Sequence, residues 1–370
     1  MIYWAFLFAA LVILLFVLKR DHTWFYGMYQ TVSAIVFARR PSIFNQIVKD
    51  EIQAPDGERY AVWWSSKTDK HFNKTIKTHD TTNDLLVSDS SSKIWIILPG
   101  GMTTADTFYT WDAIKSGLFD DEPWCIFHNP GIINKCYKRS PPGLTETTYL
   151  EHLIQMLKRQ GRQISVIGFS AGSMLTIAIA KKADELDDLK GSNDKSKTLD
   201  CCVAVHGPDK IRDVFEYFYH ETYSRLDILF SLSLYTTMCK SGCTQFLPLN
   251  AGGGLHKNKL VWLSGWSWMK AYTEDVFQSP WHKMEESLWS CDSALSTPII
   301  TPVMRVLSLN DPIVDFSRCC NPRNFSNVDK VYFQPKAGHC CAFRYDKDLA
   351  THIKRWRNQI LERNDTKKEN

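Results

Sequence analysis

The feature that most constrains this chain is a serine with glycines two residues to either side: Gly168, Ser170 and Gly172. Residues 164–167 before it are an apolar run, and residues 173–180 after it are small and apolar, as in a buried helix. A serine on a tight strand-to-helix turn takes an unusual backbone conformation, and the flanking glycines let strand and helix approach closely. We therefore expect the Ser170 hydroxyl to stand at the end of a strand, at the N-terminus of a helix.

A serine hydroxyl is a weak nucleophile until a base removes its proton, so Ser170 needs a base and an acid elsewhere in the chain. In the α/β-hydrolase fold the chain order is Ser, then Asp or Glu, then His. Asp311 and His339 each follow a predicted strand, and ligands bind at the carboxyl ends of strands in open α/β sheets. We expect Asp311 to orient His339 and His339 to take the proton of Ser170.

Two other residues compete for these roles. Asp315 is the competing acid, and Asp311 itself could instead cap a turn before a proline. His206 follows another predicted strand but precedes the acid, which is too early for the base of this fold. We therefore expect His206 to be a structural or pocket residue.

Acyl transfer to a serine also needs two N–H donors aimed at the developing oxyanion. One should be the N–H of Ala171, the residue after the nucleophile. The other should come from the loop at residues 99–103, where Gly101 or Met102 would supply it. The alternative for this loop is a plain Gly-Gly turn.

The apolar runs predict a mostly parallel sheet with helices on both faces. Together with the serine turn and the Ser-Asp-His order, this predicts an α/β-hydrolase fold. The runs are too continuous for a sheet that is buried on one face only. They lie at residues 60–64, 94–98, 124–127, 164–167, 201–205, 303–309 and 330–333. An amphipathic helix is expected at residues 349–361.

The predicted organisation has six parts. Residues 209–302 are dense in aromatics and leucines and are expected to form an inserted helical cap, or else packing helices that do not contact substrate. The parts are a membrane anchor at 1–20, an interfacial or linker segment at 21–53, the first part of the core at 54–208, the cap at 209–302, the second part of the core at 303–361 and a disordered charged tail at 362–370.

From about residue 54 to residue 361 the chain resembles the membrane-associated branch of the α/β-hydrolases. That branch includes bacterial YheT-like esterases, medium-chain fatty-acid ester synthase/esterases and single-pass abhydrolase-domain lipases and phospholipases. The resemblance rests on Pro55-Asp56-Gly57, Pro99-Gly100-Gly101-Met102-Thr103, Gly168-Phe169-Ser170-Ala171-Gly172, Asn310-Asp311-Pro312-Ile313 and Gly338-His339. It implies carboxylic esters of fatty acyl chains as substrates. Pro99 replaces the usual His and Pro130 the usual Arg, so we expect the acyl pocket and the substrate preference to differ from those of the family.

The first residues predict a membrane anchor. Residues 2–18 are all apolar or aromatic, and Lys19 and Arg20 end the run. At about 1.5 Å per residue the run spans roughly 25 Å, the lower limit for a bilayer core. A cleaved signal peptide is less favoured, since the basic pair follows the run and no small-residue cleavage site is present. Residues 24–37 predict either an interfacial helix or an ordinary buried one.

The side of the membrane is left open by the sequence. Basic residues after the apolar run, Lys19, Arg20, Arg39 and Arg40, favour a cytoplasmic domain, in the endoplasmic reticulum or another endomembrane. The 11 cysteines, an odd number with three adjacent pairs, make a poor disulfide framework and agree with this. Three glycosylation patterns, at Asn73, Asn324 and Asn364, keep a lumenal domain as the alternative.

Composition excludes some partners and functions. The formal net charge of +4 is too small to indicate a nucleic-acid surface. Cys239 and Cys243 lack a second pair at zinc-ligand spacing, so neither a metal nor a cofactor is expected. The partners expected are an acyl-ester or lipid substrate and a membrane, and no protein partner is identified. The function expected is ester hydrolysis, with acyl transfer to an alcohol or a non-catalytic scaffold as alternatives.

Overall fold

The computed structural model describes residues 22–65, 93–100, 104, 106–120, 122–130, 132–133, 147–190, 197–220 and 290–369. The predicted anchor at residues 1–20 and most of the predicted cap, residues 221–289, lie outside these described residues. Within them, no helix is both long and apolar enough to cross a membrane.

An eight-stranded sheet forms the centre of the described chain, in the order β1-β2-β4-β3-β5-β6-β7-β8. Only β2 runs opposite to the other strands, so the carboxyl ends of β3 and of β5 to β8 meet at one edge. The strands are β1 (Val48–Gln53), β2 (Arg59–Trp64), β3 (Lys93–Leu98), β4 (Trp124–His128), β5 (Gln163–Phe169), β6 (Cys201–Val205), β7 (Val303–Ser308) and β8 (Lys330–Gln334). This order and the single antiparallel strand are those of an α/β-hydrolase-like sheet.

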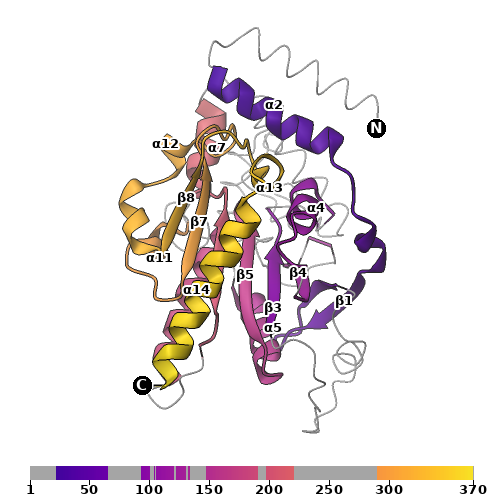
Figure 1. Cartoon of the computed structure of the whole chain (residues 1–370), viewed down its shortest axis with the longest axis vertical. Coiled ribbons are helices and arrows are strands. Elements are labelled where there is room, and N and C mark those ends of the chain that lie inside the picture. Colours follow the sequence, from indigo (N-terminus) through magenta and orange to yellow (C-terminus); the bar gives the residue numbers. More distant parts are fainter. Residues whose placement is uncertain are drawn as a thin grey trace, which may run out of the picture.

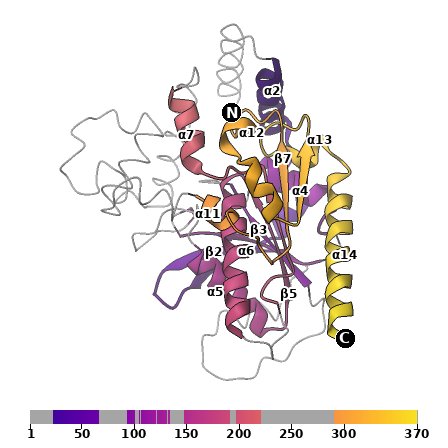
Figure 2. The same ribbon diagram turned by 90° about the vertical axis from the view of Figure 1, so that its left-hand side faces the viewer.

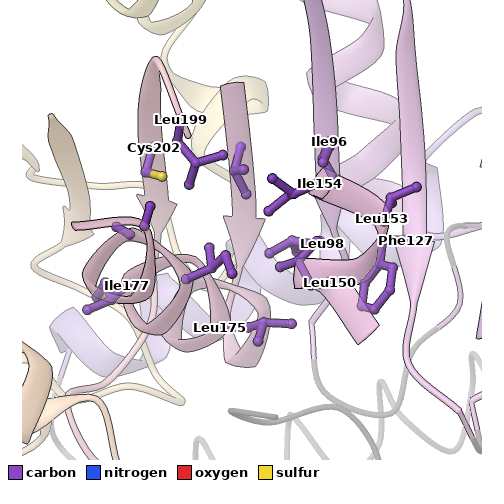
Figure 3. Close-up of a cluster of buried hydrophobic side chains, with 14 of the residues drawn as sticks. Ile96, Leu98, Phe127, Leu150, Leu153, Ile154, Leu175, Ile177, Leu199 and Cys202 are labelled. Carbon is purple, nitrogen blue, oxygen red and sulfur yellow. The ribbon is translucent and has the colours of Figure 1, made fainter. Parts of the chain in front are cut away.

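Helices cover both faces of the sheet, as the sequence predicts (Figures 1 and 2). One face carries α5 (Thr148–Arg159), α6 (Ala171–Lys190) and the short α11 (Asp292–Leu295). The other carries α4 (Phe108–Lys115), α13 (Ala342–Tyr345) and α14 (Leu349–Glu369). Figure 3 shows the first of the two layers, where leucines of α5 and α6 meet apolar side chains of the central strands. Strands buried on both faces explain the continuous apolar runs.

The remaining helices lie at the edges of these layers. They are α2 (His22–Phe37), α7 (Ile211–His220), α12 (Phe316–Cys319) and the 3-10 helices η1 (Ser42–Gln46) and η4 (Pro322–Asn327). In both views α2 lies at the same end of the molecule as α12 and α13. Because α12 follows β7 and α13 follows β8, this is the end where the carboxyl ends of the parallel strands point.

The segment at residues 21–53 differs from the expected interfacial or linker segment in two ways. Its last part is β1, which pairs with β2 from Val48 opposite Trp64 to Gln53 opposite Arg59. This strand contains charged residues and shows no continuous apolar run, because an edge strand needs only alternate residues buried. The sequence pattern therefore did not predict it. Its first part, α2, combines the two alternatives given for residues 24–37. One side of the helix is buried in the domain, as in an ordinary buried helix, and the other side exposes large apolar residues, as in an interfacial helix.

The charged tail predicted to be disordered from residue 362 instead continues α14 as far as Glu369. Ile353, Trp356 and Ile360 anchor the helix on the sheet, each at most 5% exposed. Once a helix is nucleated, each further residue adds a hydrogen bond, and the Lys, Arg and Glu residues that follow have high helix propensity. Charge alone was therefore a poor indicator of disorder here.

Two observations bear on the redox and glycosylation expectations. The eight cysteines within the described ranges are all buried and carry no disulfide. Asn324, one of the three glycosylation patterns, is 4% exposed, and its side-chain amide donates to Asp209 and to Asp292. A glycan cannot be accommodated at this amide in the folded chain.

Candidate active site

Ser170 occupies the turn between β5 and α6, with φ at 52°, in the left-handed region that a serine adopts only under local constraint. Its N–H donates to the Val205 carbonyl at 2.9 Å, and its carbonyl accepts the N–H of Ser173 at 2.9 Å. These bonds hold the peptide units on both sides of the residue, so the turn keeps the strained conformation.

The two glycines of the turn are required by the packing of backbone on backbone. A Cβ on Gly168 would lie 2.1 Å from the Gly172 carbonyl oxygen, and a Cβ on Gly172 would lie 2.3 Å from the Leu98 carbonyl oxygen. No side chain fits either position, which is the reason inferred from the sequence.

The structure brings Ser170, His339 and Asp311 into one hydrogen-bonded row. The Nε2 atom of His339 lies 3.0 Å from the Ser170 hydroxyl oxygen, and its Nδ1 atom lies 2.8 Å from Oδ2 of Asp311. Asp311 follows β7 and His339 follows β8, so the parallel register delivers both loops to the same edge as the end of β5. His339 and Asp311 are 7% and 6% exposed. A neutral imidazole that donates Nδ1–H to the carboxylate presents an unprotonated Nε2 to the serine.

The second oxygen of Asp311 fixes the direction of the carboxylate. Oδ1 accepts the backbone N–H groups of Ile313 and Val314, each at 2.8 Å. Oδ2 is then left to face His339. The competing acid, Asp315, instead caps α12, where its side chain accepts the Ser317 N–H at 2.9 Å.

Two opposed effects set the proton affinity of His339. Burial, the largest single effect, favours the neutral imidazole, but the attraction and hydrogen bonding of the Asp311 carboxylate and of Cys340 together outweigh it. The pKa of His339 is therefore raised well above its ordinary value. A base with a raised pKa becomes available only as the pH rises.

His206 supports the loop that carries His339 through hydrogen bonds and does not serve as the base. Its Nδ1 accepts the backbone N–H of Cys340 at 2.9 Å, and its Nε2 lies 2.8 Å from the Gln334 amide oxygen. Because a backbone N–H can only donate, the ring proton is on Nε2. Burial lowers the pKa of His206 to about 4, against the opposing attraction of Asp311, so the ring stays neutral near pH 7. This is the structural role expected of it.

Asn310 joins the loop after β7 that carries Asp311 (the acid loop) to the loop after β8 that carries His339 (the base loop). The sequence did not single out Asn310 for this role. Its side-chain oxygen accepts the N–H groups of Ala337 and Gly338 at 2.9 and 3.0 Å. Its amide nitrogen donates to Gln30 of α2 at 2.8 Å. Its position directly before Asp311 was the only available signal, since the partners lie far away in the chain.

The oxyanion loop is only partly described. Gly101 and Met102 lie outside the described residues. Gly100 lies against the nucleophile: a Cβ there would be 3.2 Å from the Ser170 Cβ, and its N–H donates to the Tyr109 hydroxyl at 2.8 Å. Ala171 begins α6, where helix N–H groups have no partner within the helix and are available to an anion.

Within the described part of the chain, no group of three or more His, Cys, Asp or Glu residues is arranged to hold a metal ion.

No protein-family model and no curated protein match the chain. Among solved structures, an esterase of Pyrococcus furiosus has 15% identity and a TM-score of 0.48, over 86% of this chain and 90% of that one. A bacterial membrane phospholipase A has 11% identity and a TM-score of 0.48, over 97% and 98%. Naproxen esterase of Bacillus subtilis has 12% identity and a TM-score of 0.45, over 91% and 99%. Similarity at this level identifies neither an activity nor a substrate.

Proposed function

We propose that this chain is a serine hydrolase that cleaves carboxylic esters of fatty acyl chains through an acyl-serine intermediate. The observation that carries the proposal is the row of hydrogen bonds from Ser170 through His339 to Asp311, at 3.0 and 2.8 Å. The row starts on a strained turn whose glycines admit no side chain. Strained backbone conformations of this kind are concentrated at functional sites.

The proposed reaction follows from the direction of each hydrogen bond. The Ser170 oxygen attacks the ester carbonyl as Nε2 of His339 takes its proton, and Asp311 stabilises the imidazolium that forms. The N–H of Ala171, together with one from Gly101 or Met102, would stabilise the oxyanion. His339 then returns the proton to the departing alcohol, which leaves the acyl group on Ser170. Water attacks the acyl carbonyl as His339 takes its proton; His339 then gives that proton to the Ser170 oxygen as the acid leaves, which restores the site.

A lipid substrate at a membrane is the finer part of the proposal. The apolar run at residues 2–18 favours an anchor, and α2 adds an exposed apolar surface next to the site. Tyr26, Tyr29 and Val36 lie three and seven residues apart, on one stripe of the helix, and are 45%, 57% and 46% exposed. Aromatic and aliphatic side chains in this arrangement favour the membrane interface. We propose that the domain faces the cytoplasm, since basic residues follow the apolar run at its C-terminal end, where the domain begins.

The test is covalent labelling by a fluorophosphonate, followed by turnover of a panel of esters from short to long acyl chains. We expect the wild-type chain to label and the Ser170→Ala variant not to label. Ser173→Ala is the matched control, because Ser173 is buried one turn away and its hydroxyl has no hydrogen-bond partner among the described residues. A folded wild-type chain that neither labels nor hydrolyses any ester would refute the proposal.

A further inference from the structure

Helix α2 is in contact with both loops that carry the partners of Ser170. A Cβ on Gly27 would lie 1.7 Å from the carbonyl oxygen of Asn310, so the helix backbone touches the acid loop. A Cβ on Gly338 would lie 2.7 Å from the carbonyl oxygen of Gly27, so the helix also touches the base loop. Gly338 has φ at 65°, which disfavours any other residue there. Glycines on both sides of this contact allow an approach that side chains would prevent.

Thr31 holds the base residue itself. Its hydroxyl accepts the backbone N–H of His339 at 2.8 Å and donates to the carbonyl of Gly27 at 2.9 Å. The donated bond turns a lone pair of the hydroxyl towards His339, because the hydroxyl proton is already engaged within the helix. Thr31 is 5% exposed, so water cannot easily replace this acceptor.

Gln30 holds the two loops from the same turn of the helix. Its side-chain oxygen accepts from Asn310 at 2.8 Å, and its side-chain nitrogen donates to the carbonyl of Lys336 at 3.0 Å. Asn310 in turn accepts the N–H groups of the residues just before His339. Gln30 is 2% exposed, and both of its own side-chain bonds join residues more than 270 positions apart in the chain.

We propose that α2 is a positioning element of the active site, in which Thr31 and Gln30 set the place of His339 relative to Ser170. The inference rests on the proposed function, since it assigns a role in that same reaction. Neither residue touches the reacting atoms: both act through the backbone of the loops around His339 and Asp311. The buried side of α2 positions the loops, while the opposite side exposes the apolar residues proposed to meet the membrane. The same helix would therefore both bind the membrane and position His339.

The test compares Thr31→Val, which removes the acceptor at nearly constant size, with Thr31→Ser, which keeps it. We expect kcat for p-nitrophenyl butyrate to fall about 10- to 100-fold in Thr31→Val and in Gln30→Met, with KM changed less than about 3-fold, because a small misplacement of a catalytic group has this effect. Thr31→Ser should restore most of the activity. Thr301→Val is the matched control: this buried threonine donates to Asp184 at the opposite ends of the strands, so its loss should lower stability without changing kcat.

A second readout does not depend on activity. Hydrogen–deuterium exchange of the peptide at residues 336–345 should become faster in Thr31→Val than in the wild type and the Thr31→Ser variant. Unchanged kcat and unchanged exchange in Thr31→Val, or an equal loss in Thr31→Ser, would overturn the inference. Wild-type protein that does not react with a fluorophosphonate would instead overturn the proposed function, and the exchange result would then still decide whether α2 holds the His339 loop.

Discussion

Replacing Asp311 by Asn tests how the carboxylate directs the histidine. Oδ1 of Asp311 accepts two backbone N–H groups, from Ile313 and Val314, while Oδ2 accepts Nδ1–H of His339. An asparagine has one oxygen for these two places. With its oxygen towards the backbone donors, its NH₂ group faces Nδ1 of the imidazole, which then gives up its proton there. The proton moves to Nε2, and the ring can no longer accept from Ser170.

The same contacts set limits on the free energy needed to return the His339 proton to Nδ1 in this variant. Turning the amide so that its oxygen meets His339 leaves two buried N–H groups without an acceptor, at about 1–3 kcal/mol each. A total of about 2–6 kcal/mol corresponds to a loss of about 30-fold to about 25,000-fold in rate. We expect kcat/KM of Asp311→Asn to fall within this range, with the fold and the melting temperature little changed.

The assay is kcat/KM for a soluble chromogenic ester measured from pH 5 to pH 10. The Asp311 carboxylate is the largest of the effects that, against burial, hold the pKa of His339 well above its ordinary value, so wild-type activity should still be rising above pH 6.5. Without the carboxylate the pKa of His339 falls, and the remaining activity should reach its plateau at lower pH. Asp315→Asn is the control, because Asp315 caps α12 and does not contact His339. Activity of Asp311→Asn within about 3-fold of wild type, or an equal loss in Asp315→Asn, would refute the assignment.

Three further predictions concern stability and packing. Gly172→Ala should lower the free energy of unfolding by about 3 kcal/mol or more in urea titrations, because its Cβ would lie 2.3 Å from a backbone oxygen. Gly57→Ala, with no atom within 4 Å of the new Cβ, should cost only about 1 kcal/mol through its positive φ. Burial lowers the pKa of His206 to about 4, so the unfolded chain binds more protons below pH 6.5. His206 should therefore contribute a fall of about 3 kcal/mol in stability as the pH drops from about 6.5 to about 4, and His206→Gln should reduce the slope by that amount. Gly27→Ala should reduce both activity and melting temperature, since its Cβ would lie 1.7 Å from the Asn310 carbonyl oxygen; an active, stable Gly27→Ala would show that α2 does not need this contact.

The parts of the fold that were predictable are those whose cause is local. A strand buried on both faces must be continuously apolar, so β3 to β7 could be located within one or two residues. The turn at Ser170 was predictable for the same kind of reason, because its glycines answer clashes between neighbouring backbone segments. The edge strand β1 carries half its residues in solvent and shows no such run, so it was missed.

The place of Asp311 and His339 was predictable from topology rather than from local pattern. Loops that follow parallel strands emerge at one edge, so a chain order of Ser, Asp and His at three strand ends already brings the side chains near each other. Side-chain direction was beyond this reasoning. The orientation of Asp311 depends on which backbone N–H groups face Oδ1, and these belong to the conformation of one turn.

The contribution of α2 was hidden because its partners lie about 280 to 308 residues further along the chain. Even so, the segment carried a usable signal. Gln30 and Thr31 are adjacent, buried polar residues in a largely apolar helix, and a buried polar group must find a hydrogen-bond partner. If the side chains of Gln30 and Thr31 bonded only within α2, leucine or alanine could replace them at these two positions. The presence of a glutamine, a threonine and a close-packed glycine on one side of α2 therefore points to a fixed polar partner, and in this chain that partner is the pair of loops that present Asp311 and His339 to Ser170.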